Sequence, residues 1–180
     1  MFGRGRARTR VTDVLLASVV LRLSLCERMT PTELVGRLTR YHEVAAAAVA
    51  ATAGHVLRYV GDCSIAVWTC EPASAAASPA RLARELVVRI RRGLDLDAAG
   101  TTGEERLHVG LARGACVVEE HGRRIVRVQG HAALRLDELP AARGRPGDLL
   151  VIDAALRSEF PGAALADLGG GAFCVADAFA

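Results

Sequence analysis

Residues 54–68 read GHVLRYVGDCSIAVW, which is two mainly apolar runs on either side of a Gly-Asp pair. Short runs rich in β-branched and aromatic residues are typical of strands, and a Gly-Asp pair between two such runs favours a tight turn. The stretch therefore predicts an antiparallel hairpin, with strands at 55–60 and 64–69.

The segments around the hairpin predict the elements that pack beside it. Residues 11–21 are apolar and rich in β-branched residues, which indicates a buried strand. The sequence TPTE at 30–33 supplies a capping threonine, a proline for the first helical position and the glutamate of a capping box. A helix is therefore expected to begin there and to end at Gly54. A Ser-Pro pair at 78–79 begins a second helix in the same way.

The remainder of the chain predicts further strands and helices. Strands are expected at 107–111, 115–120, 124–129 and 149–152, helices at 131–139 and from Asp153 to just before Pro161, and a closing strand pair at 163–168 and 172–175. The leading order of strand, helix, hairpin, helix and strand is typical of a ferredoxin-like split-βαβ core. The predicted fold class is α+β, a mainly antiparallel sheet flanked by helices. A basic, flexible tail at 1–10 precedes a single domain at 11–180.

Composition and charge exclude several classes of protein. Hydrophobic residues make up 51% of the 180 residues and charged residues 24%, which is the balance of a folded globular domain. The net charge of +3 is too small to indicate nucleic acid as a partner, and the apolar stretches are too short or too interrupted by charge to span a membrane. The five cysteines include no C-x-x-C pair, which favours reduced thiols in a cytoplasmic protein without a metal or cofactor.

A set of motifs in a fixed order connects the chain with a known family. From about Val11 onward the chain resembles the class III adenylate/guanylate cyclase catalytic domain. The segments that carry the resemblance are VLLASVVLR (14–22), CERMTPTEL (26–34), LTRYH (38–42), AGHVLRYVGDCSIAVW (53–68), VGLARG (109–114), VQGH (128–131) and DLLVI (148–152). The resemblance implies the class III cyclase fold and a domain that pairs head to tail, with its site at the dimer interface.

The resemblance also assigns roles to positions. A cyclase joins the ribose 3′-oxygen to the α-phosphate with the help of two divalent ions, which prefer oxygen ligands. The two metal-binding aspartates of the family correspond to Ser18 and Asp62, and its base-reading lysine corresponds to Arg58. The remaining site positions are those of a Gly-Phe pair beside the triphosphate, a second base-reading residue, a ribose-orienting asparagine and a transition-state arginine, and they hold Leu21, Arg22, His131, Leu134 and Glu138.

These replacements predict that the chain is not an enzyme and has no catalytic residue. Ser18 cannot offset the charge of a divalent ion, and Leu134 has no hydrogen-bonding group. Glu138 places a negative charge where negative charge develops in the transition state. The predicted function is a non-catalytic cyclase homology domain (pseudo-cyclase), a signalling or protein-interaction module that acts as a homodimer or with another protein.

Two alternatives stay open at this point. One is a sensor that binds a nucleotide or cyclic nucleotide without turnover, and the other is the weak half of a heterodimeric adenylate/guanylate cyclase. Arg58 and Asp62 are the candidate nucleotide contacts, with Asp62 as a lone remnant of the metal site. Their simpler interpretations are an exposed cross-strand arginine and a turn aspartate that serves backbone hydrogen bonding. Asp13 is a poor substitute for Ser18, because five residues along a strand reverse the side-chain direction.

Overall fold

The computed structural model describes residues 7–23, 26–70, 78–96, 105–139, 148–176 and 178–179. Within these ranges the elements in chain order are β1 (Arg8–Leu23), η1 (Cys26–Arg28), α1 (Pro31–Ala51), β2 (His55–Val60), β3 (Cys63–Thr69), α2 (Pro79–Gly93), β4 (Glu105–His121), β5 (Arg124–Gly130), α3 (His131–Glu138), β6 (Leu149–Asp153), η2 (Ala154–Glu159), β7 (Leu165–Gly169) and β8 (Ala172–Val175). The predicted hairpin is confirmed, and β2 has the predicted bounds.

The strands form one sheet in the order β2-β3-β1-β4-β6-β8-β7, and β5 pairs with β4 outside that path. β4 is the longest strand, and along one edge it pairs with β1 from Glu105 to Glu120. Along its other edge it pairs with β6 over His108–Leu111 and with β5 over Cys116–His121. Only the β4–β6 pairing of these described strands is parallel. The sheet is therefore mainly antiparallel, as predicted.

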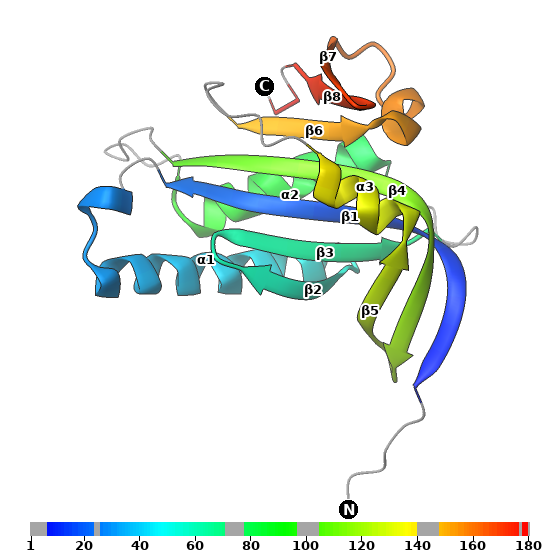
Figure 1. Ribbon diagram of the computed structural model, residues 1–180. Coiled ribbons are helices and arrows are strands. Elements are labelled where there is room, and N and C mark those ends of the chain that lie inside the picture. The colour runs from blue at the N-terminus through cyan, green and yellow to red at the C-terminus, as the bar shows by residue number, and fades with distance from the viewer. Residues whose placement is uncertain are drawn as a thin grey trace, which may run out of the picture.

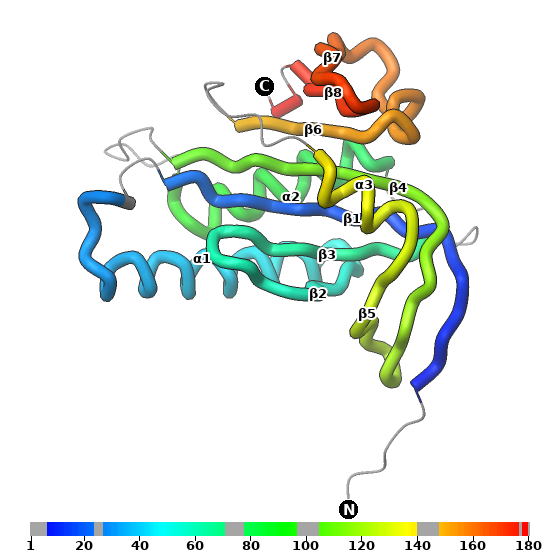
Figure 2. Tube along the Cα trace, viewed as in Figure 1, coloured from blue at the N-terminus to red at the C-terminus, as the bar shows by residue number. Residues whose placement is uncertain are grey.

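The two faces of the sheet are covered by different helices. α1 and α2 pack on one face, while α3 lies on the other, where β4 and β5 curl away from the rest of the sheet (Figure 1). Alternate residues of β1 separate accordingly: Leu15 and Ala17 join the core under α1 and α2, and Leu16 joins the core under α3. The tube view shows the same curvature in the N-terminal half of β1 (Figure 2).

α1 begins as predicted and holds the hairpin turn in place. The Thr30 hydroxyl accepts a hydrogen bond from the Glu33 amide at 3.3 Å, and the Glu33 carboxylate accepts one from the Thr30 amide at 2.8 Å, which completes the capping box. Further along, the fully buried Tyr41 donates its hydroxyl to the carbonyl of Val19 in β1. His42 Nε2 lies 2.9 Å from the carbonyl of Gly61 in the β2–β3 turn. The helix therefore ties β1 to the turn.

Three expectations about the elements need correction. The predicted strands at 107–111 and 115–120 are one strand, because Ala112 to Gly114 continue the pairing with β1. The segment after Asp153 is a short 3₁₀ helix, Ala154–Glu159. β1 begins at Arg8, so residues 8 to 10 belong to the sheet, whereas residues 1 to 6 lie outside the described residues. The division into a tail at 1–10 and a domain at 11–180 stays a prediction.

No helix in the described part of the chain is both long enough and apolar enough to cross a membrane.

Candidate functional site

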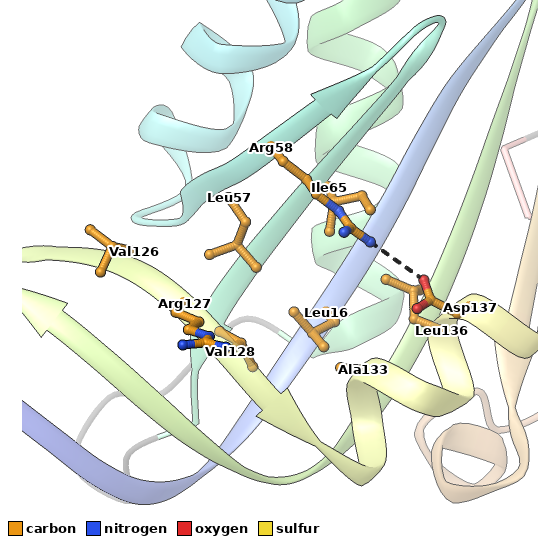
Figure 3. A pocket seen from close by; sticks show the side chains of 10 residues that line it. All are labelled: Leu16, Leu57, Arg58, Ile65, Val126, Arg127, Val128, Ala133, Leu136 and Asp137. Atoms are coloured by element: carbon orange, nitrogen blue, oxygen red, sulfur yellow. Dashed lines mark ion pairs between the residues drawn. The ribbon is translucent and has the colours of Figure 1, made fainter.

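Two adjoining pockets lie on the α3 face of the sheet, each with a volume of about 250 Å³. The first, here called the Arg58 pocket, has an apolar floor and the polar side chains of Arg58, Arg127 and Asp137 (Figure 3). The second, the Ser18 pocket, is lined by residues of β1, β3, β4, α3 and β6, among them Ser18, Arg22, Cys63, His108 and Asp137. Leu136 and Asp137 of α3 line both, so this helix forms their common wall.

The alternation of β1 decides which of its residues reach the pockets. Leu16, Ser18, Val20 and Arg22 lie on the α3 face at intervals of two, and all four line a pocket. Opposite Ser18 in β4 stands Gly110. A Cβ atom on Gly110 would lie 2.5 Å from Ser18 Oγ, so the glycine leaves the space that the serine hydroxyl occupies. The Ser18 pocket therefore depends on this small residue.

An ion pair connects β2 with α3 at the junction of the pockets. Arg58 Nη2 lies 3.7 Å from Asp137 Oδ1, and the two side chains are 60% and 66% exposed. Figure 3 shows Arg58 reaching from the hairpin toward Asp137 at the end of α3. An exposed pair of this kind contributes about 0–1 kcal/mol to stability, so either group is available to a ligand at little cost to the fold.

Two titratable groups of the Ser18 pocket are held in their neutral forms. Burial raises the pKa of the Cys63 thiol, and the nearby carboxylate of Asp62 raises it further. Burial also lowers the pKa of His108, and the positive charge of Arg22 acts in the same direction, against a smaller opposing effect of Asp148. At neutral pH the pocket therefore presents a thiol and a neutral imidazole beside the guanidinium of Arg22.

The structure brings together some of the sequence-predicted site residues. Ser18 and Arg22 line one pocket and Arg58 lines the adjoining one. Asp62 lies in the β2–β3 turn, where its carbonyl accepts a hydrogen bond from Leu21 N at 3.0 Å. Its carboxylate raises the pKa of the Cys63 thiol.

The other predicted positions lie apart from the pockets. Leu21 is fully buried in the core under α1 and α2, on the opposite face of the sheet. His131 is exposed at the first position of α3, and Leu134 is 65% exposed on the same helix. Glu138 is also exposed and forms an ion pair with Arg135 at 3.0 Å. The predicted orientation of Asp13 away from Ser18 agrees with its ion pair to Arg113, 2.8 Å away.

Sequence reasoning missed Asp137, Cys63 and His108 as pocket residues. The alternation of β4 held a signal for His108, because it lies two residues before Gly110 and so faces the same side. Asp137 has no such signal, since its place depends on how α3 docks on the sheet.

The arrangement of strands and helices matches a known class of fold. The chain has the fold of class III adenylyl/guanylyl cyclase catalytic domains, which confirms the fold that the sequence resemblance predicted. No protein-family model and no curated protein sequence matches the chain.

Solved structures match it over almost its whole length. The adenylyl cyclase CyaB from P. aeruginosa is 16% identical, with a TM-score of 0.68 and coverage of 94% of this chain and 96% of that one. The monomeric guanylyl cyclase domain of the RhoGC fusion protein from the aquatic fungus Blastocladiella emersonii is 11% identical, with a TM-score of 0.66 and coverage of 94% and 97%. A dimeric form of that RhoGC domain is 10% identical in its alignment, with a TM-score of 0.66 and coverage of 95% and 98%.

These matches contradict the prediction that the chain is not an enzyme. The proteins with the same fold are adenylyl and guanylyl cyclases by name. The structural matches do not show that Ser18, Leu134 and Glu138 replace catalytic residues, as the prediction assumed. The absence of enzymatic activity is therefore not a valid conclusion from those three positions.

The resemblance implies two divalent ions, and the residues of this chain do not fit such a pair. In the described ranges no group of three or more His, Cys, Asp or Glu side chains is placed to hold a metal ion. Asp137 is the one carboxylate among the described residues that line the pockets, and it already faces Arg58. Two divalent ions require more oxygen ligands than this face supplies.

Proposed function

We propose that the chain is one half of a two-chain adenylyl or guanylyl cyclase, in which it binds a nucleoside triphosphate on its α3 face and a complementary cyclase chain completes the site. The observation that carries the proposal is the pair of adjoining pockets on one open face, with Arg58 and Asp137 at their junction. Arg58 offers guanidinium donors to a base or phosphate oxygen, and Asp137 offers an acceptor to an amino group.

The chemistry requires groups from a second chain. In the cyclisation the ribose 3′-oxygen attacks the α-phosphorus, its proton passes to a base, and the bond from the α-phosphorus to the bridging oxygen breaks as pyrophosphate leaves. Negative charge builds on the phosphates, and preorganised donors or cations must stabilise it. Carboxylates would hold such cations, and this face has few of them. We therefore assign the missing acidic groups to a partner chain that pairs with this face head to tail.

Two exposed apolar side chains, one on α3 and one on β5, support the proposal that another protein covers this face. Leu134 of α3 is 65% exposed, and Val126, which lines the Arg58 pocket, is 42% exposed. Exposed apolar side chains that form a contiguous patch are typical of a surface that meets another protein. The same observation favours a second candidate function, a signalling module that binds a protein partner through this face.

Isothermal titration of the purified chain with ATP and with GTP, each with Mg²⁺ or Mn²⁺, tests the first part of the proposal. We expect micromolar binding of at least one nucleotide. Arg58→Gln is expected to weaken that binding at least tenfold, whereas Arg81→Gln, an exposed position on α2 at the opposite face, leaves it unchanged. No heat of binding from either nucleotide would reject nucleotide binding and leave the protein-interaction module.

A cyclic nucleotide assay tests the second part. The chain is mixed with each of the other cyclase-domain chains that its source organism encodes, and product is compared with that of each chain alone. More product from one mixture than from the sum of its members supports the two-chain enzyme. Nucleotide binding without product from any mixture would reject the two-chain enzyme and support a sensor.

A further inference from the structure

We propose that Arg22, Arg106 and His108 form a phosphate-binding site at one end of the Ser18 pocket, where cationic side chains hold the polyphosphate of a nucleoside triphosphate without a divalent ion. The inference rests on the proposed function, because it names how the same face holds its nucleotide. It follows from the observation that this face does not fit a pair of metal ions.

The three side chains share one face of the sheet. Arg22 of β1 and Arg106 of β4 stand directly opposite each other in the antiparallel register. Directly opposite residues point to the same side of a sheet, with Cβ atoms about 4.5–5.5 Å apart. His108 lies two residues further along β4, opposite Val20, and it lines the Ser18 pocket together with Arg22.

The two guanidinium groups lack a carboxylate partner among the described residues. Arg106 Nη1 donates to the carbonyl of Glu105 at 3.2 Å, which leaves its charge uncompensated. The Glu105 carboxylate is already bound by Arg37 of α1. Like charges directly opposite each other on neighbouring strands are destabilising. A bound anion between Arg22 and Arg106 would remove that repulsion.

The remaining nearby carboxylates are also engaged. Asp148 accepts hydrogen bonds from Arg91 Nη1 at 2.6 Å and from the Leu107 amide at 2.8 Å. Asp137, at the other end of the pocket, faces Arg58. The end of the pocket at Arg22 is therefore its cationic end.

The donors of this end suit phosphate. A guanidinium presents N–H groups in a planar fork that matches two oxygens of one phosphate, and two opposed guanidiniums can hold successive phosphates. The neutral imidazole of His108 adds one N–H donor, and the Ser18 hydroxyl adds another inside the same pocket. The pocket thereby provides positive charge and directed donors without a metal ion.

Titration of the full chain with sodium tripolyphosphate and with ATP, in EDTA and in Mg²⁺, tests the inference. We expect both to bind in EDTA. Arg22→Gln and Arg106→Gln are each expected to weaken tripolyphosphate binding at least tenfold, and the control Arg81→Gln to leave it unchanged. Thermal unfolding of the variants shows that they are folded, since removal of one of two opposed like charges does not destabilise the strand pair.

The outcomes separate this inference from the proposed function. ATP binding in Mg²⁺ with no binding of either ligand in EDTA overturns the metal-free site and leaves the nucleotide-binding half intact. Tripolyphosphate binding without ATP binding in any condition supports the phosphate site and rejects the nucleotide. The absence of all binding rejects both the phosphate site and the nucleotide-binding half. Tripolyphosphate binding that neither arginine substitution weakens rejects the assignment of the site to these residues.

Discussion

The opposed arginines of β1 and β4 predict that Arg22→Glu stabilises the fold. The substitution changes a cross-strand repulsion with Arg106 into an attraction. It also removes the positive charge that lowers the pKa of His108. The first effect favours the folded state at neutral pH, whereas the second does so only at acidic pH, where the histidine takes up a proton in the unfolded chain.

The size of the effect follows from simple electrostatics. Two unit charges about 8 Å apart in water interact with about 0.5 kcal/mol. Reversal of the sign therefore changes the free energy of unfolding by about 1 kcal/mol at low salt, which corresponds to an increase of about 2–4 °C in Tm for a chain of this size. In 1 M salt the Debye length is about 3 Å, so most of the gain is expected to disappear.

Arg10→Glu is the matched control, since it makes the same charge change at another position of β1, an even number of residues away from Arg22. Arg10 Nε and Nη2 bind Glu120 Oε1 at 3.1 and 3.0 Å, so its replacement by glutamate opposes two carboxylates. We expect this variant to lose about 1–2 kcal/mol. Urea denaturation of both variants at low and high salt measures the two changes. Equal effects of the two substitutions, or an Arg22→Glu gain that persists in 1 M salt, would refute the electrostatic argument.

Three further predictions concern other parts of the chain. Gly54→Ala is expected to cost about 1–3 kcal/mol in urea denaturation, because the added Cβ would overlap the indole of Trp68, and a variant as stable as the parent would contradict this packing. Burial raises the pKa of Asp153 above its unfolded value, so the contribution of this carboxyl to stability is present at low pH and is lost as the pH rises. Asp153→Asn should therefore be more stable than the parent at pH 7, and the difference should shrink toward pH 4. A difference that does not change with pH would contradict this prediction. Because burial and then Asp62 raise the pKa of Cys63, alkylation of this thiol by iodoacetamide should be slow at pH 8 and faster in Asp62→Asn, and an unchanged pH profile would exclude the influence of that carboxylate.

Local chemistry made most of the elements predictable. The capping box at 30–33 fixed the start of α1, because each of its groups satisfies a backbone donor within four residues. The β2–β3 hairpin was equally local. The continuity of β4 was not, because Gly114 interrupts the apolar pattern and only the pairing with β1 keeps the chain extended there. The full extent of β1 and β4 depends on strand partners distant in sequence and could not be predicted from local patterns.

The same distinction between local patterns and long-range contacts applies to the candidate site. The alternation of β1 was sufficient to place Ser18 and Arg22 on one face and Asp13 on the other. The partners of these residues were not predictable, because the opposition of Arg22 and Arg106 depends on a strand register formed over more than 80 residues of chain. The place of Asp137 likewise depends on the docking of α3. Residue-by-residue correspondence with a family assigned Leu21, Leu134 and Glu138 to the site, whereas the structure places them outside its pockets.

The opposed arginines connect the stability of the sheet with its proposed ligand. A substitution that relieves their repulsion is expected to stabilise the protein and to abolish phosphate binding at the same time. A purely structural role for Arg22 predicts the opposite sign for stability, since loss of a structural contact destabilises. Higher stability together with lost phosphate binding would therefore identify a binding site that is kept despite the repulsion between Arg22 and Arg106. This pattern is expected where function requires a locally unfavourable arrangement.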